Sequence, residues 1–336
     1  MSTRRAFIKS AVGAVAGIAF TGCALQPEQS ELQTRTKGRR REVVLNGRRV
    51  KTVDVHAHCV IPEAMALMGR KIERAELDMA RDRIATMDAQ GIDMEALSIN
   101  PIWYALERDR AAQVVKIQNE KLAELCAAQP DRFVAFASLA LQFPDLAVQQ
   151  LEDGVKRLGL RGAAIGGSVG DSEFADPKFH PVWAKAQDLG VLLFIHPAGV
   201  PALNKRLKGN GVLENVIGNP LDTTIALSQL IFQGTLDRFP GLKVCAAHGG
   251  GYLPSYADRS DHGCLTFPER CDPNIKLRKR PTEYLRQLYF DSLIFTPDAL
   301  RHLARQVGTK QIVMGTDYPF PWEDRAVDHI LNTPGL

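Results

Sequence analysis

Several features that mark common protein classes are scarce or missing in this sequence. The six cysteines include no Cys-X-X-Cys pair, so a zinc site built from cysteines is not expected. The excess of positive over negative charge is also small. The net charge is +4, and Arg4, Arg5 and Lys9 supply three of those positive charges. This balance gives no reason to expect nucleic acid or an acidic surface as a partner.

Two further absences narrow the choice of fold. The apolar run from Ala11 to Phe20 is too short to span a bilayer as a typical helix. No glycine-rich dinucleotide fingerprint follows the first predicted strand, Thr52–His56, which argues against a nucleotide-binding open sheet. What is present is a chain of 336 residues, 45% hydrophobic and 24% charged, a composition that is ordinary for a soluble globular enzyme.

The N-terminus has the pattern of an export signal. Ser2 to Lys9 contains paired arginines, and the short apolar run follows with no acidic residue before Glu28, which is similar to a twin-arginine signal. Phe20 to Cys23 resembles a lipoprotein box, so cleavage alone and lipid attachment at Cys23 both stay open. We therefore expect a periplasmic protein, either free or anchored to the membrane.

Export would place the cysteines in an oxidising compartment, where disulfides can form. Cys264 and Cys271 lie on loop-like sequence and are predicted to pair. Cys126 and Cys245 lie in apolar runs and are predicted to be buried thiols.

The stretch from Lys51 to Cys59 alternates apolar and polar residues. Side chains on a β-strand point to opposite faces in turn, so Asp54, His56 and His58 share one face. Two imidazoles one pleat apart are suited to holding one metal ion.

Predicted strands and helices alternate along the rest of the chain. The strands are Thr52–His56, Asp93–Ile99, Phe133–Leu139, Gly162–Ile165, Val191–His196, Lys243–Ala247, Leu288–Asp291 and Ile312–Gly315. The helical patterns are Asp78–Gln90, Arg110–Ala128, Asp145–Leu158, Pro181–Leu189, Asp222–Arg238, Pro281–Gln287 and Pro297–Val307. Asp145, Asp222 and Thr296 are predicted to begin helices.

Eight strand-helix alternations favour an α/β fold of the (β/α)8, or TIM, barrel type; a doubly wound open sheet is the alternative. The predicted divisions are a signal peptide (1–23), a linker with a short hairpin at Glu42–Val50 (24–50) and one catalytic barrel (51–336).

Histidines and aspartates fall repeatedly at the predicted strand ends, where barrel enzymes place their active sites. His196 ends the fifth strand, His248 the sixth, Asp291 the seventh and Asp317 the eighth. We predict that His56, His58, His196 and Asp317 bind a divalent metal ion, most simply Zn²⁺. His248 is then free to move a proton, and Asp54 could orient a ligand histidine. Gly249–Gly251 could bring backbone amides close to a carboxylate.

These motifs resemble the amidohydrolase superfamily, and within it the branch that contains aminocarboxymuconate-semialdehyde decarboxylase. The matching stretches are Asp54–His58, Phe194–Pro197, Thr223–Ala226, Phe239–Cys245, His248–Gly251 and Gly315–Pro321. The resemblance implies a metal-dependent, non-oxidative decarboxylase with the same four ligands, His248 as the acid/base group and Asp317 in the catalytic centre. It also implies a homodimer in which Arg259 reaches the partner's substrate, and a substrate contact at Phe320.

The sequence departs from that branch in ways that point to a different substrate. Pro62–Leu77 is short where the family carries a long insertion with a substrate arginine, so the equivalence of Arg70 or Arg74 is open. Ala198 stands where the family has a tryptophan. The family usually continues past Leu336, so we expect the last helix to be truncated. The predicted substrate is a small aromatic or unsaturated carboxylic acid; the alternatives are a hydrolase of esters, lactones or amides, and an exported binding protein without catalysis.

Overall fold

The computed structural model describes residues 40–72, 74, 79, 83–322 and 325–336. The predicted twin-arginine signal and Cys23 lie outside the described residues. The compact unit spans Gly38–Leu336. No helix within the described residues is long and apolar enough to cross a membrane.

A hairpin precedes the barrel, as predicted. Strands β1 (Val43–Leu45) and β2 (Arg48–Val50) pair antiparallel. The turn between them is made by Asn46 (φ 50°) and Gly47 (φ 75°). Two successive residues with positive φ form the tight turn that joins twisted strands, and Asn-Gly is the preferred pair for it.

The eight predicted strands all form, and they close into a barrel. They are β3 (Val53–His58), β4 (Met94–Ser98), β5 (Phe133–Ala135), β6 (Gly162–Ile165), β7 (Leu192–Ile195), β8 (Lys243–Ala246), β9 (Tyr289–Asp291) and β10 (Ile312–Val313). A three-stranded sheet in the order β3-β4-β5 and a five-stranded sheet in the order β10-β9-β8-β7-β6 are both parallel. Isolated parallel bridges join Ala137 to Ala163 and Ala57 to Tyr318, which links the two sheets at both edges. The barrel prediction is therefore confirmed over the open sheet.

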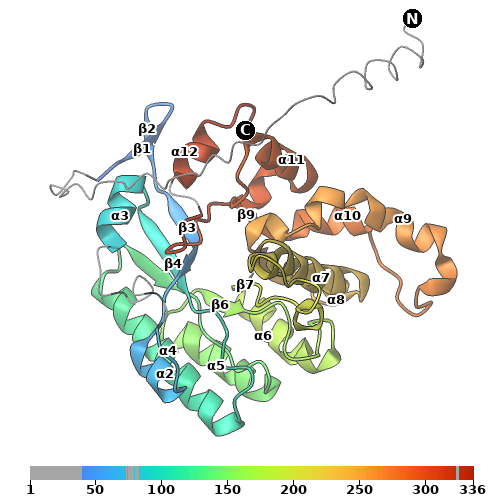
Figure 1. Ribbon diagram of the computed structural model, residues 1–336, viewed down its shortest axis with the longest axis horizontal. Coiled ribbons are helices and arrows are strands. Elements are labelled where there is room, and N and C mark those ends of the chain that lie inside the picture. The colour runs from blue at the N-terminus through green and yellow to red at the C-terminus, as the bar shows by residue number, and fades with distance from the viewer. Residues whose placement is uncertain (1–39, 73, 75–78, 80–82, 323–324) are drawn as a thin grey trace, which may run out of the picture. The chain divides into compact units, whose positions relative to one another are not determined.

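Helices follow the strands and lie outside them (Figure 1). The longer ones are α3 (Arg83–Gln90), α4 (Arg108–Ala128), α5 (Pro144–Lys156), α6 (His180–Leu189), α7 (Asn219–Phe232), α9 (Asp258–Thr266) and α11 (Pro297–Val307). The shorter ones are α2 (Pro62–Leu67), α8 (Thr235–Arg238), α10 (Pro281–Tyr284) and α12 (Ala326–Leu331).

Helix starts follow the sequence only in part. Thr296 caps α11, and its hydroxyl accepts a hydrogen bond from the Ala299 amide. The predicted starts at Asp145 and Asp222 are wrong, because α5 begins at Pro144 and α7 at Asn219. Proline is favoured in the first helical turn, where its missing N–H costs nothing. The Asp222 carboxylate instead accepts a hydrogen bond from the Ala198 amide, outside its own helix.

The barrel has an inner and an outer apolar layer. Inside it, buried side chains such as Ala96, Phe136 and Phe194 fill the space between strands. The larger outer core packs the opposite strand faces against the helices. Strands buried on both faces need apolar residues on both, which accounts for runs such as Leu192–Ile195.

The segment that follows β8 makes an excursion from the barrel. Figure 1 shows α9 far from the strands that it follows in sequence. A disulfide joins Cys264 to Cys271, as predicted, and ties the end of α9 to the next turn. Cys245 is a buried thiol as expected, whereas Cys126 is half-buried.

Candidate metal centre

Two ligands come from β3, where the period-two pattern places them together. His56 and His58 are fully buried, and their Nε2 atoms lie 3.0 Å apart. A register irregularity in the pairing of β3 with β4 lies between Asp54 and Ala57. Such irregularities are common beside active sites, where they redirect side chains.

The other two ligands come from the ends of β7 and β10. His196 follows β7, and its backbone amide donates to the Ile165 carbonyl at 2.9 Å. Asp317 follows β10 with a φ of 61° and donates its amide to the His56 carbonyl at 2.8 Å. The Oδ1 atom of Asp317 lies 2.8 Å from His58 Nε2 and 3.1 Å from His56 Nε2.

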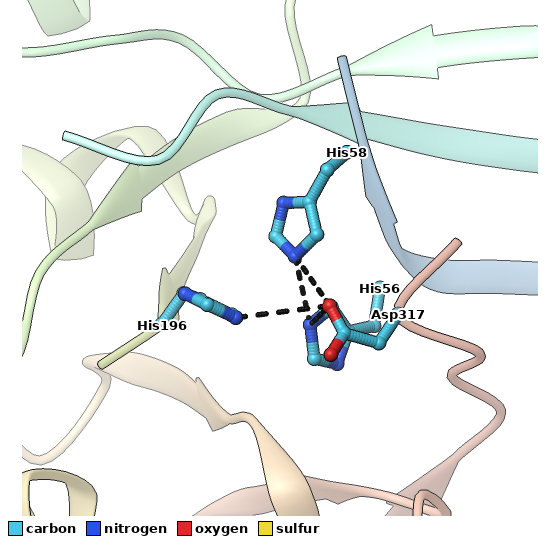
Figure 2. Close-up of side chains that lie close together, drawn as sticks. All are labelled: His56, His58, His196 and Asp317. Carbon is cyan, nitrogen blue, oxygen red and sulfur yellow. Dashed lines mark hydrogen bonds and ion pairs between the residues drawn. The ribbon is translucent and has the colours of Figure 1, made fainter. Parts of the chain in front are cut away.

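These four residues, which we call the ligand cluster, converge on one point (Figure 2). Each offers one donor atom, and all four atoms lie within 4.8 Å of one another. The cluster is buried, and Asp317 Oδ1 has no hydrogen-bond donor among the described residues. Three imidazoles and one carboxylate fit Zn²⁺ or a similar divalent ion.

The electrostatics of the ligand cluster also suit a cation. Burial lowers the pKa of His58, and burial together with His58 and His56 holds the pKa of His196 well below its usual value. Both rings are therefore neutral near pH 7, the form that binds metal. Burial opposes a charge on His56, but Asp317 and Asp291 raise its pKa to about 10. The cluster thus favours positive charge at its centre, which a divalent ion would supply in place of a proton.

Asp291 holds His56 in the orientation that a ligand needs. Its Oδ2 atom lies 2.6 Å from His56 Nδ1, so Nδ1 carries the proton and Nε2 presents its lone pair to the cluster. The same carboxylate accepts hydrogen bonds from the amides of His248 and Gly249 at 2.9 and 2.8 Å. Burial works against ionisation, yet the bond to His56 keeps the pKa of Asp291 below its usual value.

Asp54 does not have the predicted role. Its carboxylate accepts from the His56 backbone amide at 3.0 Å and from the Thr316 hydroxyl at 2.6 Å, so it holds backbone and not an imidazole. The ring-orienting carboxylate is Asp291, and its place at the end of a predicted strand was the signal that could have identified it.

The sequence patterns did not identify Ser98 as part of the site. Its hydroxyl lies 3.0 Å from His58 Nδ1 and 3.2 Å from the Ala57 carbonyl. His58 Nδ1 can donate a hydrogen bond to this hydroxyl, and the hydroxyl can donate one to the carbonyl. In that arrangement the Nε2 lone pair is free to bind metal. A serine at the end of β4 has no sequence signal of its own, because only the pairing with β3 brings it to His58.

His248 stands beside the ligand cluster but outside it. It follows β8 with a φ of 55°, and its Nε2 lies 3.5 Å from Asp317 Oδ2. Its ring centroid is 5.3 Å from that of His196. The side chain is 19% exposed against 6% for Asp317, so it reaches the cavity that a substrate would enter. This position suits a group that transfers a proton.

The glycines after His248 allow a close backbone approach. A Cβ on Gly251, which has a φ of 65°, would lie 2.0 Å from the Pro220 carbonyl oxygen. Of the three amides predicted to face a carboxylate, only that of Gly249 donates to one, and it is the carboxylate of Asp291. The amides of Gly250 and Gly251 donate to the carbonyls of Ala247 and His248.

A cavity of about 290 Å³ opens in front of the ligand cluster. We call it the first cavity, and it is lined by Asn100, Pro101, Ile102, His196, Pro197, Ala198, Asn215, Asn219, His248, Asp317, Phe320 and Trp322. Phe320 also lies against His58, with ring centroids 5.9 Å apart. Phe320 thus lines the cavity, and its contact with substrate stays a prediction.

The arginines considered from the sequence lie in two different places. Arg70 lines a neighbouring cavity of about 320 Å³ together with His58 and Phe320. The Arg74 guanidinium lies 5.4 Å from the centre of the Phe320 ring. Arg259 is exposed on α9 and lies over the Tyr256 ring, so it does not line the first cavity of its own chain.

Comparison with known proteins agrees with this site. The family model described as amidohydrolase matches residues 53–334. The 2-amino-3-carboxymuconate-6-semialdehyde decarboxylase of Dictyostelium discoideum is 31% identical over 274 residues, which cover 80% of this chain and 75% of the relative. The gamma-resorcylate decarboxylase of Rhizobium radiobacter is 29% identical over 296 residues, which cover 82% and 90%.

A solved structure gives the same result for the fold. The dihydroxybenzoic acid decarboxylase of a Polaromonas species, with bound manganese and the inhibitor 2-nitroresorcinol, superposes with a TM-score of 0.74 at 27% identity. The match covers 84% of this chain and 91% of that one. The chain belongs to the amidohydrolase family, in the branch that holds the aminocarboxymuconate-semialdehyde and gamma-resorcylate decarboxylases.

Proposed function

We propose that the protein is a metal-dependent, non-oxidative decarboxylase of a small aromatic or unsaturated carboxylic acid. The observation that carries the proposal is the position of His248, 3.5 Å from Asp317 and in the wall of the first cavity. Four other side chains already form a complete ligand set, so this imidazole is free for proton transfer. The decarboxylases among its relatives support the same reaction class.

The reaction needs one proton and no oxidant. The bond between the substrate carbon and its carboxylate breaks, the electron pair stays on that carbon, a proton adds there, and CO2 leaves. His248 is placed to hold that proton, and Asp317 Oδ2 lies within reach of its Nε2. A bound divalent ion would supply positive charge that draws the substrate's oxygen atoms to this end of the cavity. Phe320 and Trp322 offer ring faces that suit a planar substrate.

The decisive experiment measures CO2 and the decarboxylated product together. Metal-loaded protein is incubated with a panel of hydroxybenzoic and unsaturated carboxylic acids, and both products should appear in equal amounts. Hydrolysis of esters, lactones or amides without CO2 would favour the hydrolase alternative. Binding of carboxylic acids with no turnover of any class would favour the binding protein.

We propose zinc as the resident ion, because three imidazoles and a carboxylate are a common zinc set. Manganese is the competing ion, since it is bound in the Polaromonas structure. Elemental analysis of protein purified without chelator should find about one equivalent for a single such site. Manganese in that analysis would overturn the choice of zinc and leave the ligand cluster unchanged.

We propose that Arg259 completes the site of a second copy in a homodimer. Arg259 is exposed and does not line its own first cavity, and α9 also exposes Leu265 at 78%. An arginine suits a carboxylate because its planar fork can make two parallel charged hydrogen bonds.

We propose that the protein is exported by the twin-arginine route to the periplasm. The paired Arg4 and Arg5 motivate the route, and the Cys264–Cys271 disulfide suits an oxidising compartment. Replacing both arginines with lysine should leave the precursor in the cytoplasm when cells are fractionated. Unchanged delivery would contradict the route. Lipid on Cys23 would show as a mass increase in the mature protein.

A further inference from the structure

A second cavity adjoins the first. Its volume is about 280 Å³, and its lining includes Ala198, Asn204, Glu214, Asn215 and Asn219. Ala198, Asn215 and Asn219 also line the first cavity, so these three residues form the boundary between the two spaces.

The boundary includes one small side chain. Ala198 is exposed to the cavities and contributes only a methyl group. Asn215 lies in a π-helical turn, Glu214–Gly218, that leads directly into α7, so Asn215 and Asn219 are four residues apart along one helical segment. π-helical turns occur frequently at functional sites.

The backbone at the boundary is held in place by Asp222. The Ala198 amide donates to Asp222 Oδ2 at 2.8 Å, and the Gly199 amide also donates to this carboxylate. Gly167 packs so closely on Asp222 that an added Cβ would lie 2.4 Å from the carboxylate. The backbone at the boundary therefore has a fixed position.

The second cavity has the chemistry of a site for uncharged polar groups. Glu214 is the charged residue in its lining, and Asn204, Asn215 and Asn219 provide carboxamides that can both donate and accept. Lys205, Arg206 and Lys208 lie on the same loop but do not line the cavity. The neighbouring cavity at His58 differs, because it is lined by Arg70 and Lys71.

We propose that the substrate carries an uncharged hydrogen-bonding substituent that passes Ala198 and occupies the second cavity. The ring and its reacting carboxylate occupy the first cavity, beside the ligand cluster and His248. The inference rests on the proposed decarboxylase function and makes it more specific: the substrate class is an aromatic acid with an extended neutral polar group. A second carboxylate on the extension would meet Glu214 and no cation in the lining.

The test compares matched ligands on metal-loaded protein. The parent is 2,6-dihydroxybenzoate, and the derivatives carry a carboxamidomethyl or a carboxymethyl group at the meta or para position. These two substituents have nearly the same size and differ in charge. Dissociation constants are measured by calorimetry, and CO2 release is measured separately. For at least one ring position, the carboxamide should bind about tenfold more tightly than both the parent and the carboxylate.

Variants of Ala198 locate the effect. Ala198→Leu narrows the passage, so it should weaken binding of the carboxamide at least tenfold more than binding of the parent. Ala198→Ser is the matched control, and it should keep the preference because it leaves the passage open. Glu214→Gln should reduce the discrimination against the carboxymethyl derivative severalfold.

The outcomes separate this inference from the proposed function. Three results would overturn the role of the second cavity: equal affinity for parent and carboxamide, tighter binding of the carboxylate, or equal losses for both ligands in Ala198→Leu. In each case, CO2 release from the parent would still support the decarboxylase function. No binding by any of these ligands would overturn the inference alone. No CO2 release from them or from the wider set of hydroxybenzoic and unsaturated carboxylic acids would overturn the proposed function, and the inference with it.

Discussion

The floor and the wall of the candidate site are built in opposite ways. The floor is the ligand cluster, whose side chains come from the ends of barrel strands and are buried. His56 and His58 are held there by hydrogen bonds that they donate to Asp291 and Ser98. The wall around the first and second cavities comes from connecting segments, and residues such as Asn215, Trp322 and Ala198 are exposed there. Metal chemistry needs fixed distances, whereas substrate choice depends on shape and polarity at the mouth. The two functions are therefore placed on parts of the barrel with different constraints.

The largest effect is expected from removal of a floor ligand. His196→Ala should lower the metal content from about one equivalent per chain to near zero and reduce activity to background. The measurement is elemental analysis alongside CO2 release. His302→Ala is the matched control, because His302 contacts the Pro254 carbonyl from α11 and does not belong to the cluster. Full metal content in His196→Ala would remove His196 from the ligand set.

Arg259→Ala tests whether the wall of one site is completed by another chain. Loss of two charged hydrogen bonds should reduce activity about 10²–10⁴-fold. Mixing this variant with His248→Ala under conditions that allow subunit exchange should restore activity toward half of wild type per mixed dimer, since one site then carries both changes and the other neither. No recovery, despite demonstrated exchange, would place Arg259 in its own subunit or in a structural role.

Asp291→Asn tests how strictly the floor is held. The asparagine side chain is neutral, so it accepts a weaker hydrogen bond from His56 Nδ1 than the carboxylate does. Metal affinity should therefore fall about 10–100-fold. Competition with a chelator measures this directly. Asp328→Asn serves as the control, because its carboxylate pairs with Arg41. Unchanged affinity in Asp291→Asn would mean that Asp291 does not tune the metal site.

The smallest effect concerns the wall and depends on pH. Burial raises the pKa of Asp222 to about 6, although the Ala198 amide opposes the rise. A carboxyl whose folded-state pKa is raised binds its proton more tightly in the folded protein. Its contribution to the free energy of unfolding is therefore full below about pH 4 and is lost as the pH rises through about 6.

Asp222→Asn should remove this pH dependence. The free energy of unfolding of wild type, relative to the variant, should decline by about 1–3 kcal/mol between pH 4 and pH 7. Denaturant titrations at the two pH values provide the measurement. A difference that stays constant would show that Asp222 is ionised throughout and does not couple the boundary of the cavities to pH.

The floor could be predicted from the sequence because strand periodicity fixes it. Alternation put His56 and His58 on one face, and the barrel brought the ends of distant strands together. Asp291 stood at a predicted strand end, but its contact with His56 depends on how distant strands come together in the barrel. Ser98 depended on strand pairing in the same way.

The wall could not be predicted in the same way. The second cavity depends on how Asp222 anchors residues 198 and 199 and on a π-helical turn ahead of α7, and neither leaves a periodic pattern. The local helix pattern also gave a wrong prediction there. Asp222 was predicted to begin a helix, but its carboxylate accepts a hydrogen bond from the loop at Ala198.

The central claim is that four ligands hold the metal ion and that His248 acts beside them. The most direct test is the metal content of His248→Ala, measured together with its CO2 release. The account predicts that the variant keeps about one equivalent of metal while activity falls about 10²–10⁴-fold, the usual contribution of a general acid or base. Loss of the metal together with the activity would make His248 a ligand and contradict the account.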